Sequence, residues 1–147
     1  MKIDQILYYE DGEVIFEEGS VGKEFYTIES GKVEISQRIN GKKIVIAVLG
    51  KGDFFGEMAA FTDAPRTATA CAVGKVVLAS FSIESLLQRM QTNPRFTVDL
   101  LRTLINRLRN TTSTLRTLIA RLYAIDVGFV KDVLPNEEDD EKRGVPL

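Results

Sequence analysis

Apolar and polar positions alternate along much of the first half of the chain, with the period of two that is typical of β-strands. The alternating runs are rich in β-branched and aromatic residues and are separated by turns that contain glycine. Asn40-Gly41 is the strongest turn signal, because both residues tolerate positive φ. It predicts a tight hairpin between Val33–Ile39 and Lys42–Leu49.

Two more strands are expected further along, Thr69–Val73 and Lys75–Phe81, with a turn at Gly74. Short strands at such intervals favour an antiparallel barrel or sandwich, because parallel strands would need a helix in each crossover. The pattern therefore predicts a first part that is mainly β, over about residues 6–81.

The pattern changes to the period of a helix at Ser82, a residue type that commonly caps helix N-termini. Pro94 suits the first turn of a helix and opens a second, longer one. We therefore expect helices over about residues 82–124, and we take residues 1–124 as one domain.

The longer helix carries apolar residues seven positions apart, with a companion row three residues later. The two rows are Leu101, Leu108, Leu115 and Leu122, and Leu104, Thr111, Leu118 and Ile125. Such a seam is typical of paired helices. A helix of about 30 residues is roughly 45 Å long, more than a small barrel covers. We expect a homodimer through a parallel helix pair; packing of the seam on the chain's own barrel is the alternative.

The composition limits the kinds of binding and catalysis that the chain could perform. Lys plus Arg number 19 against 21 for Asp plus Glu, so the chain has no excess of positive charge that would indicate nucleic-acid binding. The chain has no histidine and one cysteine, Cys71, which we expect in the core; we find no catalytic set and no metal site. Arg102, Arg109 and Arg116 fit a solvated helix face. Because we find no catalytic set, we expect that the protein is not an enzyme. No apolar run is long enough to span a membrane, so we expect a cytoplasmic protein.

The stretch FGEMAAFTDAPRTATACA, residues 55–72, is mostly small and apolar but contains Glu57 and Arg66. A short helix that begins at Gly56 would direct N–H groups toward an anion, and Arg66 suits a phosphate. Thr67 adds a hydroxyl. Glu57 would instead accept hydrogen bonds from sugar hydroxyls. Spacing alone leaves open a second interpretation, in which Glu57 and Arg66 pair with each other.

The sequence FGE-x-A, six residues, then R-T-A resembles the phosphate-binding cassette of the cyclic-nucleotide-binding domains. That superfamily, of the catabolite activator or Crp-Fnr type, includes kinase regulatory subunits and gated channels. The SGKVEI, hairpin and GKGDFFGE stretches resemble it too, over about Ile6 to Leu122. The resemblance implies an eight-stranded antiparallel β-roll, a jelly-roll-like barrel, followed by a long C-terminal dimerisation helix.

The resemblance also implies the ligand contacts. The cyclic phosphate would bind Arg66 and Thr67, the ribose 2′-hydroxyl would bind Glu57, and backbone N–H groups of Gly56, Met58 and their neighbours would complete the site. The base would pack on apolar strand residues, for which the candidates are Ile35, Ile46 and Leu49.

On the long helix, Thr111 and Thr112 interrupt or flank the apolar seam. In the activator branch, a hydroxyl pair at this place reaches the adenine, one from each subunit. The alternative is that each threonine bonds back to its own helix. This helix favours cyclic AMP, whereas a threonine after the arginine, here Thr67, is associated with cyclic GMP in the kinase and channel branches.

Members that regulate transcription continue into a helix-turn-helix domain, whereas here FVKDVL predicts one short helix and NEEDDEKRGVPL an acidic, disordered tail, over residues 125–147. Five consecutive acids would repel a phosphate backbone, so we expect no direct nucleic-acid binding and no membrane contact. We interpret the chain as a homodimeric cyclic-nucleotide sensor with an unknown protein partner. An interaction module of the same fold with no ligand remains the alternative class.

Overall fold

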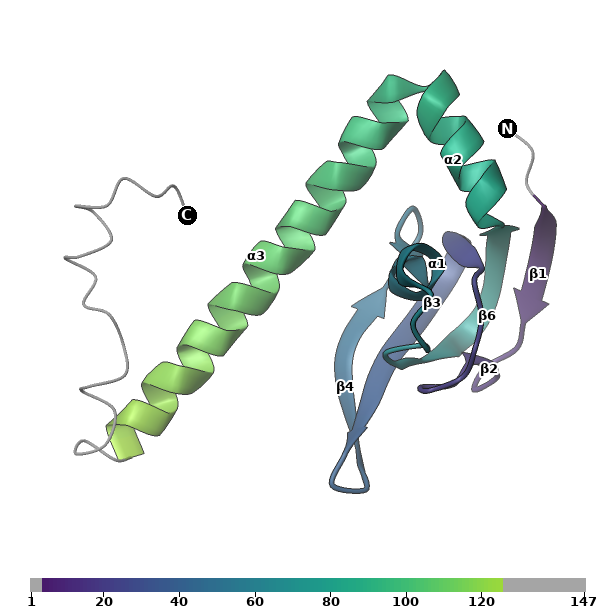
Figure 1. Ribbon diagram of the computed structural model, residues 1–147. Coiled ribbons are helices and arrows are strands. Elements are labelled where there is room, and N and C mark those ends of the chain that lie inside the picture. Colours follow the sequence, from purple (N-terminus) through teal and green to yellow (C-terminus); the bar gives the residue numbers. More distant parts are fainter. Residues whose placement is uncertain (1–3, 126–147) are drawn as a thin grey trace, which may run out of the picture. The chain divides into compact units, whose positions relative to one another are not determined.

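The computed structural model describes residues 4–125 of the chain (Figure 1). The chain divides into two compact units, residues 1–96 and residues 97–147. The first unit contains the sheet and the helices that follow its strands, and the second contains most of one long helix. The short helix expected after Gly128 and the acidic tail lie outside the described residues.

Six strands form one antiparallel sheet, in which β1, β6, β3 and β4 are neighbours in that order. The short strand β2 pairs with β6, and β5 pairs with β3, so β3 and β6 form the centre of the sheet (Figure 1). The bounds are β1 Gln5–Tyr9, β2 Val14–Phe16, β3 Phe25–Ile39, β4 Lys42–Leu49, β5 Phe54–Phe55 and β6 Thr69–Phe81. The mainly β, antiparallel class predicted from the sequence is confirmed.

The hairpin prediction is confirmed as well. β3 ends at Ile39 and β4 begins at Lys42, and the two turn residues both have positive φ, 51° at Asn40 and 75° at Gly41. This geometry matches the right-handed twist of the strands on either side, which is why Asn-Gly is favoured there. The residues of the turn therefore set the register of the β3–β4 pair from Ile39–Lys42 as far as Ser36–Val45.

The turn predicted at Gly74 is wrong, because residues 69–81 form the single strand β6. Both halves of β6 pair with the same strand, β3, and the register shifts between Ser30 and Lys32. Gly74, with φ 69°, lies in the part of β6 opposite this shift. A bulge bends a strand without ending it. Residues 4–125 contain six strands where eight were expected, and two of them, β3 and β6, are long and irregular.

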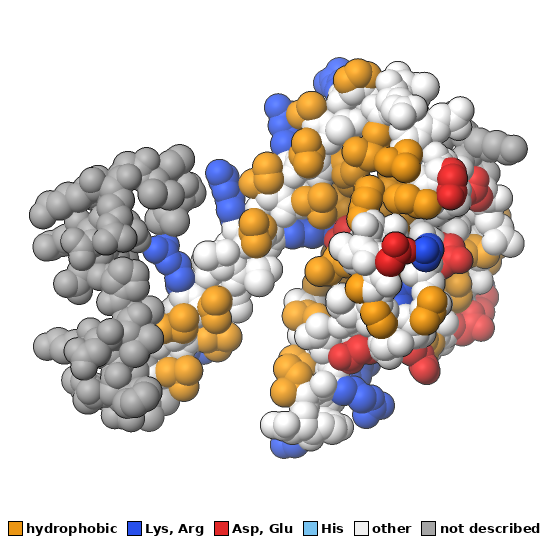
Figure 2. Space-filling view, in the orientation of Figure 1, with side chains coloured by type: hydrophobic (Ala, Val, Ile, Leu, Met, Phe, Trp, Pro, Cys, Tyr) orange, Lys and Arg blue, Asp and Glu red, His pale blue; other side chains and the backbone are white. Residues whose placement is uncertain are grey.

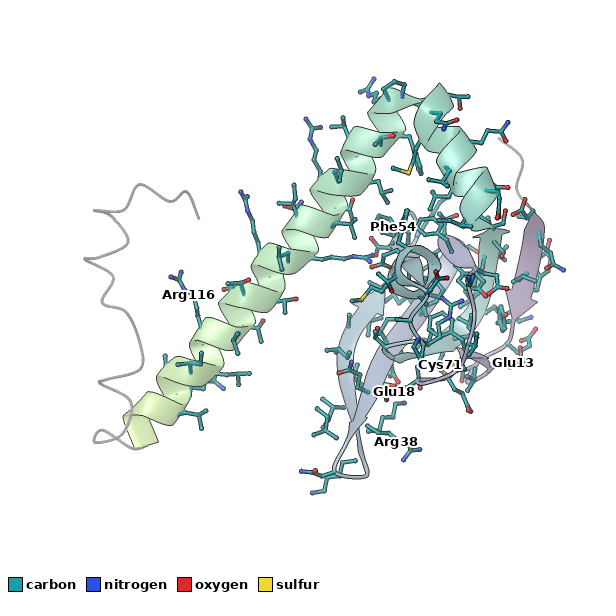
Figure 3. All side chains as sticks on the ribbon, viewed as in Figure 1. Glu13, Glu18, Arg38, Phe54, Cys71 and Arg116 are labelled. Atoms are coloured by element: carbon teal, nitrogen blue, oxygen red, sulfur yellow. The ribbon has the colours of Figure 1, made fainter. Side chains whose placement is uncertain are left out.

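The core lies against the central strands. Its buried members are Tyr26, Ile28, Val33, Phe55, Ala70, Ala72, Val76 and Leu78. Aromatic rings form one side of it, with the Tyr26 and Phe55 rings stacked at 5.2 Å between centroids and Phe16 tilted against both. Cys71, expected in the core, is only half-buried on β6, and its thiol donates to the carbonyl of Gly12 at 3.3 Å (Figure 3).

Residues 4–125 contain three helices: α1 Glu57–Thr62, between β5 and β6, and then α2 Ile83–Thr92 and α3 Pro94–Ile125 after the last strand. The predicted cap is confirmed, because the Ser82 hydroxyl accepts from the N–H of Ser85 at 3.3 Å. Pro94 is the first residue of α3, as predicted, and its missing N–H costs nothing at that position. Both helix starts were therefore readable from single residues.

Within the second unit, α3 exposes its apolar row. The side chains of Leu101, Leu108, Leu115, Leu118 and Leu122 are between 51% and 67% exposed, and Figure 2 shows hydrophobic side chains on the surface of this helix. Leu104 is half-buried. Arg116 extends away from the helix axis (Figure 3), and Arg102 pairs with Asp99 one turn earlier at 3.7 Å. The helix thus has the amphipathic surface that the heptad pattern predicted.

Candidate functional site

Arg66 is the centre of the candidate site. It lies between α1 and β6, and its side chain is only 2% exposed. Nη1 donates to the backbone carbonyls of Glu24 and Gly56, each at 3.1 Å. Nη2 donates to the Glu24 carbonyl at 3.1 Å and to Glu24 Oε2 at 3.2 Å. A buried charge is tolerated only with partners of this kind.

The Nε atom of Arg66 is the exception. It is buried, and it has no hydrogen-bond partner among residues 4–125. A guanidinium has five N–H donors, so Nε–H is the donor left over by the four hydrogen bonds described above. The guanidinium also lies over the Phe16 ring, 4.3 Å from its centroid. The site therefore holds a positive charge at a defined place with one donor unused.

Two glycines let the backbone approach this guanidinium. A Cβ on Gly56 would lie 2.8 Å from the Glu24 carbonyl oxygen and 2.9 Å from Arg66 Nη1, and Gly56 has φ 82°. A Cβ on Gly22 would lie 2.8 Å from Arg66 Nη2. Only glycine fits both requirements at position 56, positive φ and close contact. Gly56 was expected at the start of a short helix, and it is the N-cap of α1, whereas Gly22 was missed.

The ion-pair partner of Arg66 is Glu24, at 3.2 Å, which the sequence did not indicate. Spacing had left open a pair between Arg66 and Glu57. Glu24 lies 42 residues from Arg66 in the sequence, in the segment before β3, and no local pattern links the two. The pairing of Tyr26 on β3 with Phe55 on β5 places Gly56 next to Glu24, and Arg66 donates to the carbonyls of both residues.

The cassette residues lie around Arg66. Glu57 is half-buried in the first turn of α1, after Gly56 at the N-cap, while Met58 is exposed. Thr67 is exposed, and its hydroxyl lies 3.7 Å from Met58 Sδ. The structure therefore brings the polar cassette residues together within α1 and the loop that follows it.

A hydrogen bond ties the cassette loop to the sheet. Gln37 Nε2, on β3, donates to the Thr67 carbonyl at 2.7 Å. Gln37 is a second contact that sequence reasoning missed, because the two residues are 30 positions apart.

The candidates for base packing divide into two groups. Ile35 and Leu49 are partly buried and pack against the core. Ile46 is 54% exposed on β4, at the bulge where Ala47 pairs with Ile35 and Val45 pairs with Ser36. Ile46 therefore does not share the burial of Ile35 and Leu49.

Thr111 and Thr112 lie on α3, in the second unit, and are exposed. Their hydroxyls donate to the carbonyls of Arg107 and Leu108, both at 2.9 Å. This is the back-bonded arrangement that the sequence left open. It uses the hydroxyl proton and leaves oxygen lone pairs on each threonine able to accept.

The pKa of Tyr26 depends in part on the charges of Glu24 and Arg66. The pKa of Tyr26 is raised to about 12, chiefly by burial and next by the Glu24 carboxylate, while the Arg66 guanidinium acts in the opposite direction. The Tyr26 ring lies 5.8 Å from the guanidinium carbon. The Tyr26 phenol is therefore uncharged near neutral pH.

Residues 4–125 contain no group of three or more acidic, cysteine or histidine side chains that could hold a metal ion. Among the same residues, no helix is both long and apolar enough to cross a membrane. The Arg66 cassette is thus the polar cluster on which a functional assignment can be built.

Comparison with known proteins gives a family match. The model of the cyclic nucleotide-binding domain matches residues 6–93. A curated relative, the CRP-like cAMP-activated global transcriptional regulator of Mycobacterium tuberculosis, is 36% identical over 109 residues, which is 74% of this chain and 49% of that protein. The chain therefore spans about half the length of this relative.

Solved structures give the same result. The catabolite activator protein of Thermus thermophilus aligns with a TM-score of 0.71 and 32% identity, over 78% of this chain and 54% of that one. The EAL enzyme Bd1971 aligns in its cAMP-bound form, with a TM-score of 0.57 and 31% identity, and in its cGMP-bound form, with 0.58 and 32%. Both Bd1971 alignments cover 82% of this chain and about a third of that enzyme.

Proposed function

Because the chain belongs to the cyclic nucleotide-binding domain family, we propose that it binds a cyclic nucleotide at the Arg66 site, with cyclic AMP preferred. The ligand acts as a signal, and the chain is a non-enzymatic regulatory module of the cytoplasm that works as a homodimer. The partner that receives the signal is a further protein, whose chemistry the described residues do not identify.

The unused Nε–H of Arg66 is the observation that carries this proposal. A cyclic phosphate oxygen at that donor would complete the hydrogen bonding of a guanidinium that is otherwise fully bonded, and a charge-assisted bond of this kind is strong. Because the Arg66 side chain is 2% exposed, binding requires the cassette loop to move outward or the guanidinium to shift toward the ligand.

The remaining contacts are proposed for the other cassette residues. The Thr67 hydroxyl and backbone N–H groups of residues 56–58 and 67 bind the phosphate, and Glu57 accepts from the ribose 2′-hydroxyl. Ile35, Leu49 and the more exposed Ile46 provide the apolar surface for the base. The position of Glu57 in the first turn of α1, directly after Gly56, supports this division of roles.

Titration calorimetry with cyclic AMP tests the proposal. We expect a Kd on the order of 1 μM for the full chain, and loss of at least two powers of ten in affinity on Arg66→Ala. The matched control is Arg109→Ala, which removes the same charge from α3. No heat with the full chain, or equal affinity for the Arg66 variant, contradicts the proposal.

A second experiment does not depend on the folding of an Arg66 variant. If Glu57 binds the 2′-hydroxyl, 2′-deoxy cyclic AMP should bind the full chain about tenfold more weakly than cyclic AMP. Glu57→Ala should bind the two ligands equally, whereas the control Glu84→Ala should keep the tenfold difference. An unchanged preference in Glu57→Ala would remove Glu57 from the site.

The choice of cyclic AMP rests on Thr111 and Thr112, whose hydroxyl oxygens have lone pairs that can accept from the adenine amino group. Cyclic GMP is the second candidate, favoured by Thr67. In a competition titration we expect cyclic AMP to bind at least fivefold tighter than cyclic GMP. Thr111→Val combined with Thr112→Val should abolish this preference; a preference that survives assigns base selection to other residues.

The homodimer is proposed through the exposed row of α3, formed by Leu101, Leu104, Leu108, Leu115, Leu118 and Leu122. Burying such a row against a second copy removes several leucines from water at about 25 cal/mol per Å². Sedimentation should give a dimer for the full chain and a monomer for Leu108→Glu with Leu115→Glu. The control Ser113→Glu, outside the row, should remain dimeric. A monomeric full chain contradicts this part of the proposal.

A further inference from the structure

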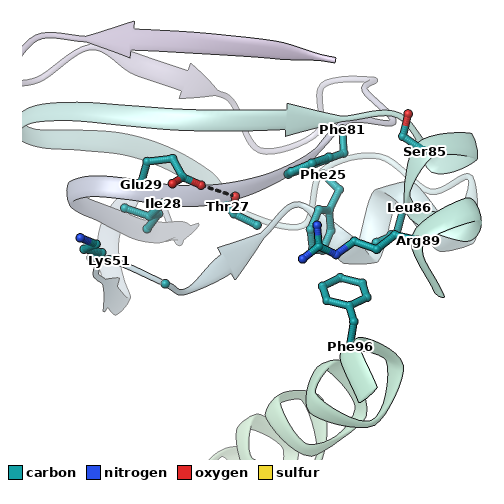
Figure 4. A pocket seen from close by; sticks show the side chains of 11 residues that line it. Phe25, Thr27, Ile28, Glu29, Lys51, Phe81, Ser85, Leu86, Arg89 and Phe96 are labelled. Carbon is teal, nitrogen blue, oxygen red and sulfur yellow. Dashed lines mark hydrogen bonds between the residues drawn. The ribbon is translucent and has the colours of Figure 1, made fainter. Parts of the chain in front are cut away.

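A cavity of about 260 Å³ lies in the first unit. Its walls come from β3, from the loop before β5, from the end of β6, from α2 and from the first turn of α3. Phe25, Phe81 and Phe96 contribute three aromatic rings, and Leu86 adds an aliphatic wall (Figure 4). None of the proposed cyclic-nucleotide contacts lines it.

Arg89 is the polar group of this cavity. Its guanidinium lies over the Phe96 ring, 4.5 Å from the centroid, and Figure 4 shows it between Phe25 and Phe96. The Nε atom is buried without a hydrogen-bond partner, and no ion pair of Arg89 is formed among residues 4–125. An arginine remains charged at all ordinary pH values, so this cavity contains a cation without a described counter-ion.

The other charged groups of the cavity do not compensate this cation. Lys51 and Glu29 carry opposite charges at the end away from Arg89 (Figure 4). The Glu29 carboxylate accepts from the Thr27 hydroxyl at 3.1 Å, so it has a local partner. The charge next to the aromatic walls is therefore positive.

We propose that this cavity binds a small aromatic carboxylate. The carboxylate pairs with the Nε edge of Arg89, which supplies the missing partner in a charge-assisted bond. The ring packs among Phe25, Phe81 and Phe96, where offset and edge-on ring contacts are favourable. This ligand is distinct from the cyclic nucleotide.

The size of the cavity agrees with a ligand of this class. Its volume equals that of about nine water molecules in the liquid and falls just below the usual range for drug-sized ligands. A single substituted ring is therefore of suitable size. Since the walls include both the end of the sheet and α2, such a ligand would stabilise the contact between them.

The test uses phenylacetate as probe, with phenylacetamide as its neutral analogue of the same shape. In amide-resolved NMR titrations of the full chain, phenylacetate should shift the resonances of Phe25, Leu86 and Arg89 and bind at least tenfold tighter than phenylacetamide. Arg89→Gln should reduce this ratio to about one. Arg95→Gln, an exposed neighbour that loses the same charge, should leave it unchanged.

A second control separates this site from the cassette. Saturating cyclic AMP should leave the phenylacetate shifts at Leu86 and Arg89 in place, and Arg66→Lys should not alter phenylacetate affinity. No shift at millimolar probe, equal binding of acid and amide, or shifts centred on residues 56–67 would each overturn the proposal. Because the two ligands are titrated separately, failure here leaves the proposed function untouched.

Discussion

Arg66 and Arg89 place the same side chain in two different environments of one unit. Each guanidinium lies over a phenylalanine ring, Phe16 at 4.3 Å or Phe96 at 4.5 Å, and each has a buried Nε without a hydrogen-bond partner in residues 4–125. Arg66 also makes four hydrogen bonds, one of which is the ion pair with Glu24. Arg66 thus holds backbone segments together through its hydrogen bonds, whereas Arg89 contributes to the wall of a cavity.

The largest difference should appear when each arginine is replaced by methionine. Arg66→Met leaves the carbonyls of Glu24 and Gly56 without these donors, so we expect a loss of about 3 kcal/mol in the free energy of unfolding. Arg89→Met loses only the ring contact, about 0.5 kcal/mol. Urea denaturation followed by circular dichroism measures both, and equal losses would break the comparison.

The next effect concerns the glycine beside Arg66. Gly56→Ala combines positive φ with contacts of 2.8 and 2.9 Å, and we expect it to cost about 3 kcal/mol. Gly52, on the wall of the Arg89 cavity, has φ 87° but open space around its Cβ position. Gly52→Ala should therefore cost only the backbone strain, about 1 kcal/mol. Thermal denaturation of both variants checks this, and a smaller loss at Gly56 would mean that the cassette loop yields easily.

A third effect depends on pH. The pKa of Tyr26 is raised by burial to about 12, above the value near 10 of an unfolded chain, so its contribution is complete below pH 10. It is lost as pH rises through 12, because the unfolded state releases its proton first. We expect on the order of 1 kcal/mol between pH 10 and 12. Urea denaturation at pH 9 and at pH 11.5 measures this loss in the free energy of unfolding. The loss should be smaller in Tyr26→Phe than in the unchanged protein, and it should stay the same in the exposed control Tyr8→Phe.

The smallest effect compares the rings under the two guanidiniums. Phe96→Leu removes the ring contact of Arg89 at a half-exposed place, and we expect about 0.5 kcal/mol. Phe16→Leu should cost about 1.5 kcal/mol, because Phe16 also contacts Tyr26 and Phe55. Chemical denaturation of the two variants gives the order, and a reversed order would show that Arg89 depends on its ring more than Arg66 does.

Much of the fold was predictable because it depends on neighbouring residues. Asn40-Gly41 specified a hairpin, Ser82 capped α2 and Pro94 opened α3, each by its own backbone preference. The turn at Gly74 was wrong for the opposite reason. A glycine with positive φ suits a turn or a bulge, and only the shared pairing with β3 made it a bulge.

The cassette was predictable as a motif, and its geometry was not. The order of glycine, acid and arginine in residues 55–68 indicated a phosphate site, and the family match over residues 6–93 covers it. The partner of Arg66 could not be predicted. Glu24 has no pattern of its own, and it meets Arg66 across 42 residues of sequence.

The sequence by itself determined the antiparallel class, the helix starts, the amphipathic row of α3 and the identity of the cassette, because each depends on residues within a few positions of one another. Tertiary structure decided the rest. It brought Glu24 and Gly22 to Arg66, merged two predicted strands into β6, left Cys71 half-buried and placed Arg89 on the wall of a cavity. These outcomes depend on which distant segments pack together. Hydrophobic burial drives that packing and is non-directional, so a local sequence pattern does not specify which segments meet.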